Sequence, residues 1–294
     1  MGANIMEGSV CAVVVTYNRV ALLQKCLHAI LTQSVAVAHV LVVDNHSTDE
    51  TPRVISEMTD KRVIYRRLDA NYGGAGGFKR GIAAAISDTP DHFFWIMDDD
   101  TVPTQTALAA LLKAREQVPN FGFLTANVRW KDDSPMNVPP IAGDWAEATR
   151  KDVIKVHEAS FVSLFVSRSR VNEVGLPFAD FYIWHDDTEF TLRLAEAGNG
   201  YYVPQAIVIH ESRSNQAPLI YRDAADRIPR YYYLYRNEMY ICRKHKGRLT
   251  LVRTFVRDLY VSLKVLLVAP DHRLQRSVTV LRGTFSGLRF LPKG

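Results

Sequence analysis

The feature that most constrains this chain is a series of short apolar runs, each followed by polar residues and then by apolar residues at helical spacing. Four such runs occur within the first hundred residues: VCAVVV, HVLVV, VIY and FFWIM. Strands that are apolar throughout belong inside a parallel sheet with helices on both faces. The pattern therefore predicts an α/β fold, Rossmann-like and mostly parallel, that binds its ligand at the carboxyl ends of its strands.

This alternation of strands and helices ends near residue 120, and the rest of the chain predicts a different arrangement. Strands are expected in FGFLTANVRW, FVSLFVSR and GYYVPQAIVIHES, and a helix ended by Gly198 follows WHDDTEF. The pattern from Tyr231 to Val268 is mostly helical. We predict one domain over residues 1–240, in halves 1–100 and 101–240, and a basic amphipathic helical region over 241–294.

Composition narrows the class of protein only a little. The 294 residues are 47% hydrophobic and 23% charged, which is ordinary for a globular protein. The three cysteines (Cys11, Cys26 and Cys242) are scattered, so no disulfide framework or zinc site is predicted and a reducing cytoplasm is favoured. We expect neither a signal peptide nor a membrane-spanning segment.

Three consecutive carboxylates, Asp98, Asp99 and Asp100, follow the apolar run FFWIM. Like charges raise one another's pKa and resist burial, so the triplet is unfavourable without a partner. A divalent cation such as Mg²⁺ or Mn²⁺ would relieve the repulsion, with Asp98 and Asp100 on one side if the chain stays extended. The alternative is a solvated acidic turn that caps the following helix.

Two further stretches lie at the same predicted edge of the sheet. Asn71 to Gly81, NYGGAGGFKRG, matches neither the GxGxxG nor the Walker pattern. It is either a tight loop that needs positive φ angles or a backbone approach to a phosphate or sugar, with charge from Lys79 or Arg80. Asp44, after HVLVV, would either cap the next helix or bind a base or ribose.

A second acidic cluster, WHDDTEF, covers Trp184 to Phe190. Acids suit the start of a helix, so capping is one interpretation. A carboxylate with a tuned pKa beside His185 is the other. His210 ends the run AIVIH and becomes a candidate ligand because a cation needs more than two aspartates.

Taken in order, these motifs resemble those of family 2 glycosyltransferases with the GT-A fold. The segments are VVVTYNR, VVDNHSTD, NYGGAGGFKRG, WIMDDD, WHDDTEF and IVIHES, which span residues 10–212. The chain looks most similar to bacterial galactofuranosyltransferases and the neighbouring rhamnosyltransferases. The resemblance implies an inverting, Mn²⁺- or Mg²⁺-dependent transfer from a nucleotide sugar. The donor would be UDP-galactofuranose, or alternatively dTDP-rhamnose, and the acceptor a glycan or a polyprenyl-diphosphate-linked glycan of the bacterial cell surface.

Carried over residue by residue, the resemblance makes residues 1–100 the nucleotide-binding half and residues 101–240 the acceptor half. Donor contacts fall on Thr16, Asn18, Arg19, Asp44, Asn71, Gly74 and Gly77, to which we add Lys79 for its charge and Asp99 toward the sugar. The metal ligands would be Asp98, Asp100 and His210, and the general base Asp187. Asp186 and Glu189 would hold the acceptor or support the base, beside Trp184 and His185.

The C-terminal region carries most of the positive charge. From Arg243 to Gly294, twelve Lys and Arg oppose two acids, which leaves −5 on the rest of a chain whose net charge is +5. Apolar residues recur at helical spacing among these basic ones (Leu251, Phe255, Leu259, Leu263, Leu266 and Leu267). The pattern predicts either a helix packed on the domain or an amphipathic helix on an anionic membrane, at the inner face of the cell membrane.

Two other classes of function compete with this interpretation. A nucleotidyltransferase would combine a similar fold with acidic metal ligands, but the first strand ends in TYNR instead of a glycine- and lysine-rich loop. Binding of nucleic acid through the basic region is disfavoured, because apolar residues separate its charges. We therefore expect no nucleic-acid partner.

Overall fold

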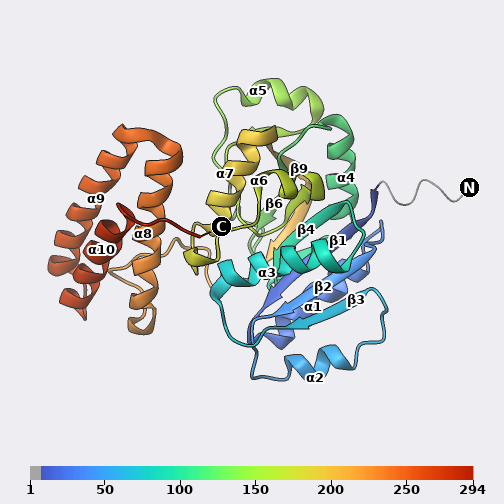
Figure 1. Ribbon diagram of the computed structural model, residues 1–294, viewed down its shortest axis with the longest axis horizontal. Coiled ribbons are helices and arrows are strands. Elements are labelled where there is room, and N and C mark those ends of the chain that lie inside the picture. Colours follow the sequence, from blue (N-terminus) through green and yellow to red (C-terminus); the bar gives the residue numbers. More distant parts are fainter. Residues whose placement is uncertain (1–7, 294) are drawn as a thin grey trace, which may run out of the picture.

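The computed structural model describes residues 8–293, in which nine strands form one mixed sheet (Figure 1). The sheet order is β3-β2-β1-β4-β8-β6-β9-β5, and β7 pairs with β9. The strands are β1 (Val10–Thr16), β2 (His39–Asp44), β3 (Val63–Arg67), β4 (Phe93–Asp98), β5 (Thr101–Pro103), β6 (Phe123–Arg129), β7 (Ile154–Val156), β8 (Leu164–Ser167) and β9 (Gly200–His210).

The first half is the predicted parallel unit. Strands β1 to β4 pair in parallel. They alternate with the helices α1 (Val20–Leu31), α2 (Thr51–Ser56) and α3 (Gly73–Asp88), and α4 (Ala107–Gln117) follows. The carboxyl ends of these strands meet at one edge, which explains why the polar residues after them gather there.

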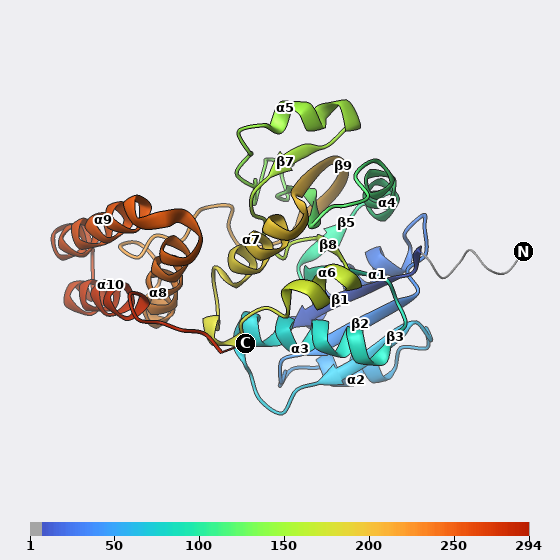
Figure 2. The ribbon, with the colours of Figure 1, turned by 45° about the horizontal axis from the view of Figure 1, so that its top comes forward.

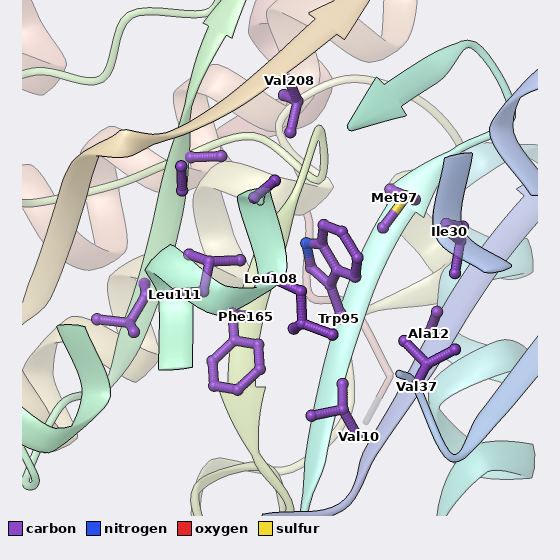
Figure 3. Packing of buried hydrophobic residues seen from close by; sticks show 14 of the residues in the cluster. Val10, Ala12, Ile30, Val37, Trp95, Met97, Leu108, Leu111, Phe165 and Val208 are labelled. Atoms are coloured by element: carbon purple, nitrogen blue, oxygen red, sulfur yellow. The ribbon is translucent and has the colours of Figure 1, made fainter. Parts of the chain in front are cut away.

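Both faces of this sheet are covered, as the continuous apolar runs predicted. Alternate residues of β1 enter two separate cores: Val10, Ala12 and Val14 face α1 and α4, whereas Cys11, Val13 and Val15 face α3 and α7. In the first core the Trp95 ring lies near Leu108 and Phe165 (Figure 3). Its indole N–H donates to Ser163 Oγ at 2.8 Å, so the buried nitrogen is satisfied.

The second half adds antiparallel strands. The strands predicted in this half are confirmed as β6, β8 and β9, and the sequence did not predict the short β5 and β7. Three helices accompany them: α5 (Trp145–Ala148), α6 (Arg168–Val174) and α7 (Asp186–Gly198). The most consequential pairing is that of β5 with β9, because it sets Thr101 opposite His210.

The helices α8 (Tyr231–Ile241), α9 (Gly247–Val268) and α10 (Arg273–Gly287) form a lobe beside the sheet, drawn in orange and red (Figures 1 and 2). Helix α8 lies nearest the sheet in both views. It packs against α10, so the helical lobe begins at Tyr231, earlier than the boundary at 240/241 expected from the sequence.

Helices α9 and α10 bury polar side chains and expose apolar ones. Thr284 Oγ1 donates to Asp258 Oδ2 at 2.9 Å, and the Ser262 and Ser277 hydroxyls lie 2.7 Å apart. The outer face of α9 carries an apolar stripe (Leu249, Val252, Val256, Tyr260, Leu263 and Leu267). Three members of the predicted stripe, Leu251, Phe255 and Leu259, are partly buried instead. Within residues 8–293 no helix is long and apolar enough to cross a membrane.

The segment after α10 returns toward the sheet (Figure 1). Phe290 packs against Phe181 and Tyr240, with ring centroids 5.8 Å from each. The backbone N–H of Lys293 donates to Asp180 Oδ2 at 2.9 Å. The lobe is therefore attached to the sheet domain at both of its ends, through α8 and through this segment.

Candidate functional site

An acidic turn follows β4 at the carboxyl edge of the sheet. Asp98 is the last residue of the strand, and Asp99 and Asp100 form a turn before β5. Because the chain turns here, the expectation of an extended segment with Asp98 and Asp100 on one side does not hold. The pairing of β5 with β9 places His210 Nε2 3.1 Å from Asp100 Oδ1, so the structure brings two of the three predicted metal ligands into contact.

Two residues of the TYNR segment, at the end of β1, contact the same turn. Thr16 Oγ1 donates to Asp99 Oδ2 at 2.7 Å. Arg19 Nη1 donates to Asp99 Oδ1 at 3.2 Å and to Asp100 Oδ2 at 2.9 Å. Both were predicted as donor contacts; in the structure Arg19 offsets part of the negative charge of the acidic turn, and Thr16 contributes a hydrogen bond.

The surroundings of the turn still disfavour the charged forms of two of its carboxyls. Burial, followed by the charge of Asp100, raises the pKa of Asp98 to about 8. Burial also raises the pKa of Asp99 to about 6. For Asp100, burial acts in the same direction, but the hydrogen bond and charge of His210 outweigh it and hold the pKa below its usual value.

The donor atoms at this turn fit Mn²⁺ or Mg²⁺. Asp98 and Asp100 supply carboxylate oxygens, which suit these ions, and His210 would add one imidazole nitrogen. Within the described part of the chain, no group of three or more His, Cys, Asp or Glu side chains is placed so that it could hold a metal ion by itself. A cation here would therefore take further ligands from phosphate oxygens and water, as Mg²⁺ commonly does.

Asn18 and Asp44 serve mainly to shape the neighbouring loop. Asn18 Oδ1 accepts from the backbone N–H of Thr48 at 2.7 Å. Asp44 is buried, and its two oxygens accept from the Ser47 backbone N–H at 2.7 Å and from the Tyr65 hydroxyl at 2.5 Å. In this structure Asp44 anchors the turn after β2 and does not cap α2, whose N-cap position is Glu50, so its contact with a base or ribose stays a prediction.

The glycine-rich stretch is the start of α3 and not a loop. Of its glycines only Gly73 has a positive φ, at 71°. Two of the others allow close packing: a Cβ on Gly77 would lie 2.7 Å from Val15 Cγ1, and one on Gly81 would lie 2.9 Å from Val43 Cγ2. Asn71 precedes the helix and accepts from the Gly73 N–H at 2.9 Å, and Lys79 lies partly buried on the helix.

Gly74 differs from Gly77 because an added Cβ would meet no atom within 4 Å. We expect Gly74→Ala to raise the free energy of unfolding by about 0.5 kcal/mol, since alanine loses less entropy in a helix. The matched Gly77→Ala is expected to lower it by about 1–3 kcal/mol, because Val15 has to shift. Urea denaturation measures both, and stabilisation by Gly77→Ala would contradict the close contact.

A short segment leads from the 3₁₀ turn Ala179–Phe181 into α7 and touches the start of α3. The Ala75 backbone N–H donates to the Tyr182 carbonyl at 3.2 Å. A Cβ on Gly73 would lie 2.3 Å from the same carbonyl oxygen, so only glycine fits there. The segment that leads into the acidic first turn of α7 is therefore held beside the start of α3.

The two aspartates that open α7 have different protonation tendencies. Burial and the neighbouring charge of Asp187 raise the pKa of Asp186 to about 8. Burial also raises the pKa of Asp187, but the backbone N–H of Thr188 and the nearby His185 act against it. When the surroundings give two neighbouring carboxyls different pKa values, the one with the higher pKa stays protonated and the other can serve as the base. That pattern favours Asp187 as the ionised member.

The other predicted acceptor residues mostly have partners inside the protein. Glu189 receives hydrogen bonds from Arg193 Nε at 3.0 Å to each oxygen. The Trp184 ring packs on Tyr231, with centroids 5.2 Å apart. Burial lowers the pKa of His185, and its Nε2 is buried without a hydrogen-bond partner among the described residues. Of these side chains, His185 has an unsatisfied polar atom.

Two buried asparagines that the sequence analysis did not single out hold these segments. Asn45 contacts the residues before α3, and Asn237 of α8 contacts the residues before α7. The sequence signal for each is weak. Asn45 directly follows Asp44 at a strand end, and Asn237 is a lone amide within the aromatic helical stretch YYYLYRNEMY.

A family model described as "Glycosyl transferase family 2" matches residues 11–165, which is more than half of the chain. The chain belongs to glycosyltransferase family 2. The matched region of this family 2 member contains β1 to β4, the acidic turn and the start of α3. The resemblance noted from the motifs is thereby confirmed.

Among curated proteins the chain is similar to galactofuranosyltransferase GlfT1. It is 29% identical to the Mycolicibacterium smegmatis protein over 203 residues, covering 64% of this chain and 66% of the relative. With GlfT1 of Mycobacterium tuberculosis it is 26% identical over 205 residues, covering 66% of each. The succinoglycan biosynthesis protein ExoO of Rhizobium meliloti matches over 91 residues at 36% identity, covering 31% of this chain and 25% of ExoO. The matched part is just under two thirds of the length of the GlfT1 proteins.

Two solved structures share the fold. GalNAc-T7 with UDP, GalNAc and Mn²⁺ superposes with a TM-score of 0.61 at 13% identity, covering 85% of this chain and 54% of that one. Residues 1–349 of TarS from S. aureus superpose with a TM-score of 0.54 at 14% identity, and the match covers 96% of this chain and 73% of that one. The predicted fold class, a GT-A α/β fold with C-terminal helices, is confirmed.

Proposed function

We propose that this chain transfers galactofuranose from UDP-galactofuranose, with inversion, to a glycan or a polyprenyl-diphosphate-linked glycan of the bacterial cell surface. The similarity to the GlfT1 proteins supports the sugar. The observation that carries the reaction type is the contact between Ala75 N–H and the Tyr182 carbonyl. It holds the segment that leads into the base-bearing turn beside the start of α3, and transfer requires a base next to the donor.

The two acidic centres divide the chemistry between them. A divalent cation held by Asp98, Asp100 and His210 would offset the negative charge that builds on the departing diphosphate. Arg19 would add positive charge at the same place, and the open surface at Gly74 would let the donor approach the helix start. Asp187 would take the proton of the acceptor hydroxyl as it attacks.

A donor screen tests this proposal. Calorimetry would compare UDP-galactofuranose, UDP-galactopyranose and dTDP-rhamnose in Mn²⁺ and in Mg²⁺. We expect UDP-galactofuranose to bind most tightly and to be hydrolysed slowly without acceptor. Binding of dTDP-rhamnose alone would instead make the chain a rhamnosyltransferase, which is the principal alternative. Nucleotide release from a nucleoside triphosphate, with none of the sugars bound, would favour a nucleotidyltransferase.

We also propose that the chain is cytoplasmic and binds the anionic inner face of the cell membrane through α9 and α10. These helices bury hydroxyls and carboxylates and expose apolar side chains, which is the packing of helices that contact lipid. Exposed arginines such as Arg248 and Arg253 flank the stripe and would contact anionic headgroups. A lipid-linked acceptor would give this contact a purpose.

Introducing two charges into the stripe is expected to abolish this binding. Val256→Glu with Leu263→Glu should weaken partition onto anionic vesicles about 100-fold, because two apolar side chains that would enter the membrane are replaced by carboxylates that anionic headgroups repel. Val138→Glu with Ile141→Glu is the matched control, since both residues are exposed apolar side chains outside the lobe. Co-sedimentation at low salt measures the effect. Equal binding by both double variants would refute the assignment.

A further inference from the structure

The segment that leads into α7 has an unusual backbone. Tyr182, Trp184 and His185 have φ angles of 62°, 62° and 65°, although none of them is glycine. L-residues adopt this left-handed region rarely, and the conformation persists only where the surroundings hold it. Asp186 and Asp187 follow directly, so the direction of these carboxyls depends on how the segment is held.

Asn237 of α8 supplies most of the hydrogen bonds that hold it. The Asn237 side chain is fully buried, and its Nδ2 donates to the carbonyls of Phe181 at 3.0 Å, Ile183 at 3.2 Å and Trp184 at 2.8 Å. Its Oδ1 accepts from Arg236 Nε at 2.9 Å, which fixes the orientation of the amide. Arg236 in turn donates to the Asp180 carbonyl.

The segment is also enclosed from two other directions. The Tyr182 carbonyl accepts from Ala75 N–H on α3, as described above. The Tyr182 ring stacks on Tyr233 of α8, with centroids 4.8 Å apart. The segment is therefore fixed between the helix that begins the donor side and the first helix of the C-terminal lobe.

We infer that Asn237 is a positioning residue for the reaction: it keeps Tyr182, Trp184 and His185 in their left-handed conformations and thereby aims Asp187 at the acceptor. This inference rests on the proposed function, because Asp187 is the base only in that proposal. Asn237 itself is buried beneath the segment and acts through it. The C-terminal lobe thus takes part in the active site as the source of this contact.

A matched residue exists on the donor side. Asn45 is also buried, its Nδ2 donates to Asn71 Oδ1 at 3.1 Å and to the Gly73 carbonyl at 2.9 Å, and its Oδ1 accepts from Tyr72 N–H at 2.9 Å. Each of the two amides donates hydrogen bonds to a segment before a helix: Asn45 to the residues at the start of α3, and Asn237 to the residues before α7. Replacing each with aspartate keeps the shape and removes the donor.

The test compares Asn237→Asp with Asn45→Asp in the full chain. We expect Asn237→Asp to increase hydrogen exchange at residues 182–187 and to lower kcat about 100-fold, the effect of a displaced catalytic group, while the dissociation constant for UDP with Mn²⁺ is unchanged. Asn45→Asp should instead weaken UDP binding and leave exchange at 182–187 as in the wild type. Tyr233→Leu, which introduces no charge, should shift exchange and kcat in the same direction as Asn237→Asp.

Unchanged exchange and unchanged kcat in Asn237→Asp or, if that variant does not fold, in Tyr233→Leu would overturn the inference. So would equal losses of UDP binding and kcat, because that pattern indicates general damage. If the wild type transfers no sugar at all, the proposed function fails by itself. In that case, increased hydrogen exchange at residues 182–187 in Asn237→Asp, and not in Asn45→Asp, would still show that Asn237 fixes the conformation of this segment.

Discussion

Asp187→Asn is expected to lower the rate of sugar transfer by about a thousandfold and to leave donor binding intact. An asparagine keeps the shape of the side chain but cannot accept the acceptor's proton, and general bases typically contribute 10²–10⁴-fold. The donor contacts lie on other elements, so the dissociation constant for the UDP-sugar should not change. Steady-state kinetics and calorimetry on the same preparation measure the two quantities.

Asp186→Asn is the matched control for this substitution. Because burial and the charge of Asp187 raise the pKa of Asp186 to about 8, this carboxyl is mostly protonated at neutral pH, and an amide replaces it with little change in charge. We expect a much smaller loss of rate. In the wild type the rate should fall as the pH drops through the pKa of Asp187, which burial holds above its ordinary value. If the Asp187→Asn variant transferred sugar faster than the Asp186→Asn variant, Asp186 would be the base and Asp187 would not.

Removal of the divalent cation is expected to weaken binding of the nucleoside diphosphate about 100-fold, or by roughly 3 kcal/mol. The cation would connect the carboxylates of the acidic turn to the phosphates, and without it the two sets of negative charge repel each other. Asp100→Ala should cause a similar loss in the presence of Mn²⁺, since it removes the carboxylate paired with His210. Calorimetric titration with UDP, with Mn²⁺ or with EDTA, measures both effects.

Measuring Asp100→Ala in EDTA distinguishes a loss of UDP binding caused by loss of the cation from a loss caused by local structural damage. If Asp100 acts through the metal, Asp100→Ala and the wild type should bind UDP equally weakly in EDTA, because the losses are not additive. Asp132→Ala, which removes an exposed carboxylate elsewhere, should bind as the wild type does under both conditions. Full transfer by the wild type in EDTA would rule out a metal at this turn.

The sheet and its ligand-binding edge were predictable because local pattern determined them. Strand β4 is apolar on both faces, and a strand of that kind has few places other than the centre of a covered sheet. The contact between His210 and Asp100 was not predictable from pattern. It depends on the pairing of two strands more than a hundred residues apart, and only the family resemblance suggested it.

Two expectations failed because they depended on tertiary packing. The interpretation of the stretch after Asn71 as a loop was wrong: Gly77 and Gly81 admit Val15 and Val43 against a helix, and no local signal reports a distant neighbour. On α9, apolar residues at helical spacing define more than one stripe. Phe255 is partly buried against Phe285 of α10. The packing of α10 against α9 therefore determines which apolar stripe of α9 is exposed.

The inverted packing of α9 and α10 also has a thermodynamic consequence. The heat-capacity change of unfolding arises mainly from apolar surface that becomes newly hydrated. In these helices Leu249, Val252, Tyr260 and Leu267 are already hydrated in the folded state, whereas the groups that unfolding would expose include Asp258, Ser262 and Thr284. Each residue of the lobe should therefore contribute less heat capacity than a residue of the sheet domain, and the stability of the lobe should vary less steeply with temperature.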